Sequence, residues 1–221
     1  MIGQLDVLPL REHVYAYLRQ QMNLGALTPG STIIIKEIAN HLGISNTPLR
    51  DALIQLEIEG FVTILPRRGV RVNILELKDV KNAYDAIGMV EASIVQDCSE
   101  KIGASHISKL EKLNRIMISD IEKNDFRRLF KTNLEFHDVY INVSGNELLK
   151  KFILPIKHRL YDFPRHNYDG EWEMRNCLEH QDFIENLKTG NSKKAASILK
   201  DAHWSFEYQE HFIRKFYNME S

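Results

Sequence analysis

Side chains that can read DNA are grouped within a short stretch of this sequence, which contains Ser45, Asn46, Thr47 and Arg50. An asparagine amide can form two hydrogen bonds with adenine, and serine or threonine hydroxyls can bind a base or a phosphate. Arg50 follows about one helical turn later, where its guanidinium could reach a phosphate or a guanine. At the start of the second helix of a helix-turn-helix, such residues face the edges of the bases. We therefore predict that this segment contacts DNA.

A second group of residues could bind the DNA backbone beside that segment. Lys36 opens the preceding predicted helix, and Arg67 and Arg68 lie at the tip of a predicted hairpin. Gly69 follows them and would let the backbone approach DNA closely. Taken singly, each arginine is better explained as a solvated surface charge. The whole constellation, with its turn glycine and basic hairpin, favours DNA binding.

Three of the nine histidines lie on three different predicted helices of the C-terminal part: His137, His180 and His203. Asn133 precedes His137 by four residues, so both lie on the same face of a helix. Imidazole nitrogens and an amide oxygen could together bind one divalent cation inside a helical bundle. The long spacings between the histidines leave the alternative open that each is an ordinary core or surface residue.

The elements that position the DNA-reading residues follow the order of a winged helix-turn-helix. Apolar spacing predicts helices over 9–24 and 36–42 and a third helix from the N-cap Ser45 to Gly60. Gly43 suits the tight turn between the second and third helices. Residues 32–35 are expected to be extended, and 61–65 and 70–73 to form a hairpin.

From residue 77 onward the pattern is helical, and no further strand is expected. We predict six helices, over 77–102, 105–123, 125–143, 146–162, 171–189 and 192–217. The fold class is therefore mainly α, with a winged helix-turn-helix in residues 1–74 and an all-α bundle of about six helices in residues 75–221.

Composition and charge are those of a water-soluble protein with a local basic region. The 221 residues are 43% hydrophobic and 27% charged, with a net charge of −1. Residues 1–75 contain seven Lys or Arg and six Asp or Glu, so the positive charge is concentrated in the DNA-reading and hairpin segments. Cys98 and Cys177 are expected to be reduced and buried. The sequence shows no signal peptide and no apolar run of membrane-spanning length, which predicts a cytoplasmic protein without membrane contact.

The N-terminal part resembles a known family of DNA-binding domains. The segments LGISNTPLRDALIQLEIEGFVTI and RRGVRV are similar to the winged helix of GntR-type bacterial transcription regulators, over about residues 8–73. The resemblance implies dimeric binding to palindromic double-stranded operators. It places family contact positions at Lys36, Ser45, Asn46, Thr47, Arg50, Arg68 and Gly69. The family usually has arginine at the position of Asn46, and because arginine prefers guanine and asparagine prefers adenine, the operator is expected to differ.

The C-terminal part resembles the FCD effector domain of the FadR subfamily. The segments NLEFHDVYINVSGNELL, CLEHQDFIENLKTGN and KDAHWSF carry this resemblance, which extends over about residues 77–215. It implies a divalent metal, zinc or nickel, bound by Asn133, His137, His180 and His203. Asn133 stands where aspartate is commoner, so a neutral oxygen replaces a carboxylate and weaker metal binding is expected.

The effector position of the resemblance also departs from the common pattern. Ile87 stands where family members often have an arginine that faces the effector. Arg159, Arg165 and Arg175 could supply the missing charge, although each is also explained as a surface or salt-bridging arginine.

Together these features predict a homodimeric transcription regulator, by default a repressor, controlled by a small molecule. We expect that molecule to be an organic acid bound at or near the metal. One alternative is a metal-free regulator whose bundle serves only for dimerisation. A more remote alternative is a metal-dependent hydrolase, in which the histidine cluster activates water.

Overall fold

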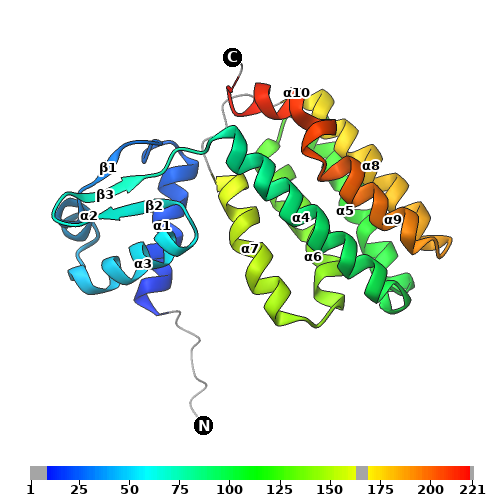
Figure 1. Cartoon of the computed structure of the whole chain (residues 1–221), viewed down its shortest axis with the longest axis horizontal. Helices are drawn as coiled ribbons and strands as arrows, with labels where there is room; N and C mark the ends of the chain where they lie inside the picture. Colours follow the sequence, from blue (N-terminus) through cyan, green and yellow to red (C-terminus); the bar gives the residue numbers. More distant parts are fainter. Residues whose placement is uncertain (1–8, 163–168, 220–221) are drawn as a thin grey trace, which may run out of the picture. The chain divides into compact units, whose positions relative to one another are not determined.

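The computed structural model describes residues 9–162 and 169–219 (Figure 1). The chain forms two compact units, one extending to Glu76 and including the end of α7 from His158, and the other beginning at Leu77. The predicted domain boundary, between residues 74 and 75, lies two residues before this division. Within the described residues, no helix is both long enough and apolar enough to cross a membrane.

In the N-terminal unit, helix α1 (Leu10–Asn23) packs against helix α3 (Asn46–Ile58). The buried residues of α1 recur at intervals of four, at Val14, Leu18 and Met22. The inner face of α3 is formed by Leu49, Ala52, Leu53 and Leu56. This spacing places one apolar stripe of each helix toward the other, and both helices were predicted from the sequence.

The helix-turn-helix is formed by α2 (Ile35–Leu42) and α3. Gly43 ends α2 with φ of 65°, a left-handed conformation that glycine adopts without steric cost. Ser45 holds the N-cap position of α3, but its side chain makes no capping hydrogen bond. The expected position of the cap is therefore right, while the hydroxyl of Ser45 is not used for capping.

Three short antiparallel strands complete this unit: β1 (Thr32–Ile33), β2 (Val62–Leu65) and β3 (Gly69–Val72), in the order β1-β3-β2. The predicted hairpin is β2 and β3, with Leu65 opposite Gly69. Its turn contains Arg67 at φ of 62°, and Gly69 has φ of 95°. Arg67 thus occupies a conformation that non-glycine residues rarely adopt.

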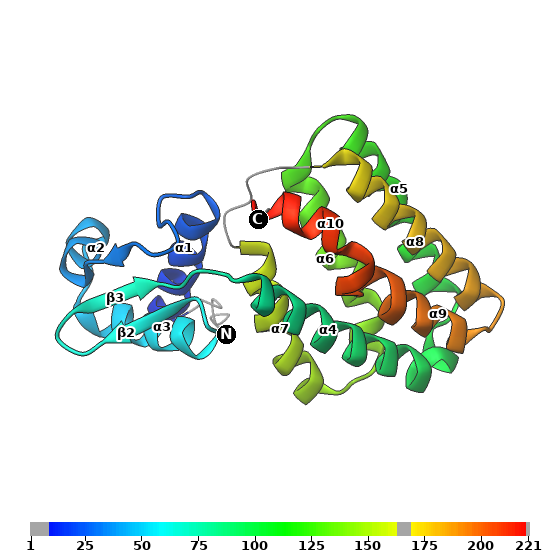
Figure 2. The same cartoon turned by 45° about the horizontal axis from the view of Figure 1, so that its top comes forward.

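The second unit is a helical bundle without strands among its described residues. It contains α4 (Leu77–Cys98), a short 3₁₀ turn (Ser99–Lys101), α5 (Ala104–Glu122), α6 (Phe126–Val143), α7 (Glu147–Asp162) as far as Lys157, and α8 (Gly170–Lys188). Helix α9 (Ser192–Ile198) and helix α10 (Phe206–Phe216) follow. Helix α5 packs against α6 and α8, α4 packs against α6 and α9, and α8 lies beside α9 (Figure 2). The predicted fold class is confirmed, and both cysteines are buried free thiols.

One predicted helix of the bundle is wrong. The expected continuous helix over 192–217 is divided into α9, a π-helical segment (Leu199–His203) and α10. Trp204 has φ of −104° and ψ of 23°, and Ser205 then caps α10 by accepting a hydrogen bond from the backbone N–H of Tyr208. Apolar periodicity continues through such a break, so the pattern alone did not reveal it. The π segment ends at His203, and π-helical turns are frequent at functional sites.

Candidate metal centre and DNA-binding surface

Three buried histidines converge in the core of the bundle. His137 comes from α6, His180 from α8 and His203 from the end of the π segment. Each offers one ring nitrogen, and these nitrogens all lie within 4.8 Å of one another. The exposed fractions of the three residues are 0%, 1% and 6%. The bundle thus brings together the three histidines that the sequence had singled out.

Several nitrogens in this cluster have no hydrogen-bond partner among the described residues: Nε2 of His137 and both ring nitrogens of His180. Buried polar atoms are nearly always paired, because an unpaired one loses its hydration without compensation. Three imidazoles at this separation, two of them with unpartnered nitrogens, form a donor set that suits zinc or nickel. The residues present therefore fit a divalent metal ion.

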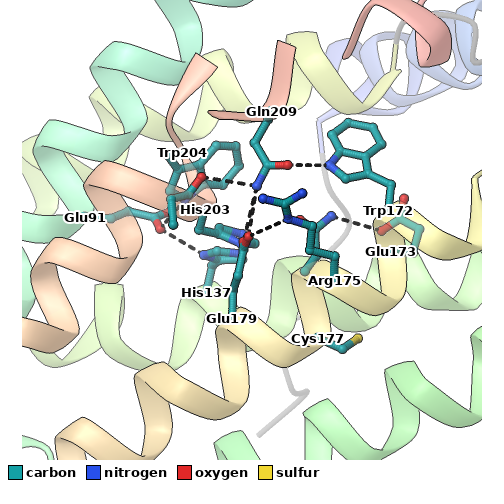
Figure 3. A network of polar contacts seen from close by, with 12 residues as sticks. Glu91, His137, Trp172, Glu173, Arg175, Cys177, Glu179, His203, Trp204 and Gln209 are labelled. Atoms are coloured by element: carbon teal, nitrogen blue, oxygen red, sulfur yellow. Dashed lines mark hydrogen bonds and ion pairs between the residues drawn. The ribbon is translucent and has the colours of Figure 1, made fainter. Parts of the chain in front are cut away.

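The first histidine is oriented by a buried carboxylate from another helix. Nδ1 of His137 lies 2.9 Å from Oε2 of Glu91 on α4 (Figure 3) and 2.5 Å from the hydroxyl of Tyr140. Tyr140 donates its own hydrogen bond to the same carboxylate oxygen at 2.6 Å. With Nδ1 engaged in this way, Nε2 is the nitrogen left for a metal. Such carboxylate–histidine pairs fix the ring and raise its basicity as a ligand.

The third histidine is held in the same manner by Glu179. Nδ1 of His203 lies 3.1 Å from Oε2 of Glu179, which comes from α8. Gln209 on α10 donates to both oxygens of this carboxylate, at 3.1 and 3.3 Å, and accepts from Nε1 of Trp172 at 2.9 Å (Figure 3). Two of the three histidines thus have a dedicated carboxylate on Nδ1.

His180 is positioned by stacking instead. Its ring lies over that of Phe136, with the centroids 4.0 Å apart and the planes 22° from parallel. Phe136 is fully buried and precedes His137 on α6. The stack fixes the plane of His180, while both of its nitrogens stay free for other partners.

Glu91 also forms a buried ion pair that the sequence did not suggest. The ammonium of Lys157 on α7 lies 2.6 Å from Oε1 of Glu91, and only 2% of Lys157 is exposed. Nε1 of Trp204 donates to the other oxygen at 2.8 Å. A buried carboxylate needs such compensation, because its charge is otherwise strongly destabilised away from water. Glu91 therefore joins α4, α6 and α7 to the residue that follows the π segment.

Burial keeps the imidazoles of His137 and His180 in the neutral form that binds metals. Burial is the largest influence on His137 and lowers its pKa to about 3, and burial also lowers the pKa of His180 well below its ordinary value. Burial alone would raise the pKa of Glu91, yet that pKa is lowered. Because His137 is neutral, we attribute the lowering to the ammonium of Lys157. At neutral pH His137 and His180 are thus neutral, and Glu91 beside them is ionised.

The other residues predicted for the metal and effector sites are Asn133, Arg159, Arg165 and Arg175. Asn133 is half-buried on α6, one turn before His137. Arg175 is half-buried on α8; its Nε lies 3.5 Å from Glu179, and its guanidinium lies over the ring of Tyr208. Arg159 lies in the last turn of α7, in the segment that groups with the N-terminal unit. Arg165 lies outside the described residues.

Sequence reasoning missed the residues that support the histidines, namely Glu91, Tyr140, Lys157, Glu179 and Gln209. Glu179 adjoins His180 in the sequence, but its partner is His203, 24 residues away. Glu91 and His137 are 46 residues apart. A glutamate in a predicted buried helix face was the available signal for Glu91, since unpaired buried carboxylates are rare.

The predicted DNA contacts are exposed on the N-terminal unit. Asn46, Thr47 and Arg50 are exposed at the start of α3, directly after the exposed Ser45. Lys36 is exposed in the first turn of α2, and Arg67 and Arg68 are exposed at the hairpin turn, followed by the half-buried Gly69. Arg50, Arg67 and Gly69 border the same surface groove, so α3 and the hairpin turn form one surface. This arrangement suits a helix placed in a major groove with the hairpin beside it.

Comparisons with known proteins agree with this architecture. Residues 10–72 match the model for bacterial regulatory proteins of the gntR family, and residues 82–203 match the FCD domain. The chain is 24% identical over 208 residues, 91% of each chain, to the uncharacterised HTH-type transcriptional regulator YdhC of Bacillus subtilis (strain 168). The HTH-type transcriptional repressor RspR of Escherichia coli (strain K12) is 24% identical over 140 residues, 63% of this chain and 61% of its own. The solved structure of E. coli McbR/YncC has the same fold, with a TM-score of 0.69 at 21% identity over 96% of this chain and 99% of that one.

Proposed function

The chain belongs to the GntR family of bacterial regulatory proteins and carries an FCD domain, and on this basis we propose that it is a homodimeric transcription regulator controlled by a small organic acid. It is a bacterial helix-turn-helix regulator of the GntR/FCD type, so DNA is its partner. The winged helix would bind one half of a palindromic operator, and a second copy of the chain would bind the other half.

In this proposal the bundle holds a divalent ion, zinc or nickel, through His137, His180 and His203, with Asn133 as a further ligand. The observation that carries the proposal is the convergence of three buried histidines, whose ring nitrogens lie within 4.8 Å of one another. Nε2 of His137 and both ring nitrogens of His180 have no hydrogen-bond partner among the described residues. The ion would supply positive charge and open positions for a carboxylate oxygen. Glu91 and Glu179 orient the rings of His137 and His203, and burial lowers the pKa of His137, so its Nε2 is available as a ligand.

The effector is proposed to be a carboxylate, because three neutral imidazoles and a neutral amide leave the charge of the ion unbalanced. Arg175, already beside Glu179, could add a cation near this region, and Arg159 and Arg165 stay predictions. The effector changes DNA affinity only by as much as it prefers one arrangement of the two units over the other. We propose repression with release by the effector, and the relative RspR is a transcriptional repressor. The cytoplasm, where bacterial DNA lies, is the expected location.

Three measurements test this function. The first is metal analysis of the purified protein, with His180→Ala as the matched variant. We expect about one divalent ion per chain for the unaltered protein and much less for the variant. The second is selection of binding sites from random duplex DNA, for which we expect a palindrome. The third is titration of the selected complex with mono- and dicarboxylic acids in the presence of zinc or nickel. If none of the acids changes the DNA affinity, that result would count against effector control.

A metal-free regulator with a purely structural bundle is the second candidate. It is favoured by one observation, the neutral Asn133 where a carboxylate would bind metal more strongly. Equal and negligible metal content in the unaltered protein and in His180→Ala would support it. We assign no enzymatic role to the cluster, and hydrolysis of an ester or amide by the protein without DNA would contradict that assignment.

A further inference from the structure

An apolar residue lies in the exposed stripe of the helix that is expected to read DNA. Asn46, Arg50 and Ile54 follow one another at four-residue spacing on α3, and all three are exposed. Residues at this spacing share one face of a helix. Ile54 keeps 48% of its surface exposed, while its neighbour Leu53 is 1% exposed in the core. An isoleucine cannot bind a phosphate, so any contact that Ile54 makes with DNA would be an apolar one.

Ile54 borders a groove between α3 and the hairpin. The groove has a volume of about 480 Å³, and Arg50, Pro66 and Arg67 are among the other residues that border it. When a helix occupies the major groove and a hairpin reaches the neighbouring backbone or minor groove, the DNA strand between those grooves passes between them. The two arginines match the charge of that strand, and the apolar walls suit its sugars. In such a complex Ile54 would lie where α3 meets the edge of the major groove.

We propose that Ile54 reads thymine through contact with the C5 methyl group. That methyl is the apolar group that a base pair shows in the major groove, and apolar side chains contact it in specific complexes. Ile54 lies eight residues after Asn46, about 12 Å along the helix, a distance of about three to four stacked base pairs. With Asn46 reading adenine, α3 would prefer A·T pairs at two places in each half-site. The proposal rests on the DNA-binding function above.

The test replaces single thymines by deoxyuracil, which removes only the methyl group. Duplexes selected by the unaltered full-length protein would carry one such replacement at a time in each half-site. We expect one position at which affinity falls about three- to fivefold, the size of one lost methyl contact. At that position Ile54→Ala should bind thymine and uracil equally well, whereas Ile54→Val should keep part of the difference.

Ile58→Ala is the matched control, because Ile58 is one turn further from Asn46 and 82% exposed. It should keep the full difference between thymine and uracil. Thermal melting of each variant shows whether it is folded, and since each comparison uses one protein on two DNAs, a loss of stability cannot imitate the effect. Failure to select any sequence would contradict the proposed function itself. Sequence-specific binding with the same thymine preference in the unaltered protein and in Ile54→Ala, or with no preference in either, would overturn the role of Ile54 alone.

Discussion

Oε2 of Glu91 lies 2.9 Å from Nδ1 of His137, although 46 residues separate them in the chain. This contact determines which nitrogen of His137 faces the other two histidines. It also ties the ion pair between Glu91 and Lys157 to the candidate metal centre. Stability of the bundle and metal affinity are therefore linked through one carboxylate.

The buried ion pair should stabilise the bundle only as a pair. In Glu91→Gln the ammonium of Lys157 is left without a counter-charge in the core, so the free energy of unfolding should fall by about 3–5 kcal/mol. The double variant Glu91→Gln/Lys157→Met removes the stranded charge and should recover most of that loss. Urea unfolding of the metal-free protein, followed by circular dichroism, measures both. A double variant no more stable than the single one would contradict the pairing.

Glu179 should affect metal affinity more than stability. Glu179→Gln weakens the acceptor on Nδ1 of His203, and loss of such a supporting carboxylate typically lowers metal affinity by about 10- to 100-fold. Competition with a chromophoric zinc chelator gives the affinity. Glu185→Gln, an exposed change on the same helix, is the control and should leave affinity unaltered. Equal affinities for the two variants would remove Glu179 from the site.

Asn133→Asp should strengthen metal binding if Asn133 is a ligand. The substitution is nearly isosteric and replaces a neutral oxygen by a charged one, which attracts a divalent cation more strongly. We expect zinc affinity to rise by at least about tenfold, equivalent to roughly 1.4 kcal/mol. The same competition assay applies, with Asn142→Asp on α6 as the control for added charge. An unchanged affinity would place Asn133 outside the coordination sphere.

The metal-free protein should lose stability as the pH falls from about 6.5 toward 3. Burial lowers the pKa of His137 from 6.5 to about 3, so between these values the unfolded chain binds a proton that the folded chain does not. The contribution of neutral His137 to the free energy of unfolding is therefore complete above its pKa in the unfolded chain. Below that pKa the contribution declines by about 1.4 kcal/mol per pH unit. His180, shifted in the same direction, adds to this slope.

Urea unfolding at several pH values measures the slope, and His180→Phe is the informative variant. It removes one of the two groups while keeping a ring against Phe136, so the slope should become shallower. A slope identical to that of the unaltered protein would show that His180 is not buried in its neutral form.

The identity of residue 46 should decide one base of the operator. Arginine reads guanine through O6 and N7, and asparagine reads adenine through N6 and N7. Asn46→Arg should therefore replace adenine by guanine at one position of each half-site, with a discrimination of about 1–3 kcal/mol. Binding-site selection compares the two proteins. Arg67→Ala is the contrasting variant, because Arg67 is expected to contact a phosphate. It should weaken binding to all sequences and make the slope of log affinity against log salt concentration smaller by about one. An unchanged operator for Asn46→Arg would contradict base reading by residue 46.

Much of the fold could be predicted because its signals are local. Apolar spacing in α1 and α3, the glycine at residue 43 and the alternation around the hairpin depend on neighbours within one or two helical turns. The break after the π segment could not be predicted in this way. Residues 199–203 continue a helical apolar pattern. In the structure they form the π segment, which ends with His203 in the histidine cluster. Trp204 then donates a hydrogen bond to Glu91 on α4, which is far away in the sequence.

The candidate sites likewise have features that the local sequence predicts and features that depend on packing. The sequence by itself determined which residue types are candidate metal ligands, the polar start of α3 and the basic hairpin, because these follow from residue chemistry and helical spacing. Only the tertiary structure decided that Glu91 and Glu179 hold His137 and His203, that Lys157 is buried against Glu91, and that Ile54 borders a groove with Arg50 and Arg67. Each of these contacts joins residues from separate helices or strands. Which residues meet depends on how the helices pack and exclude water, and no local sequence pattern encodes that packing.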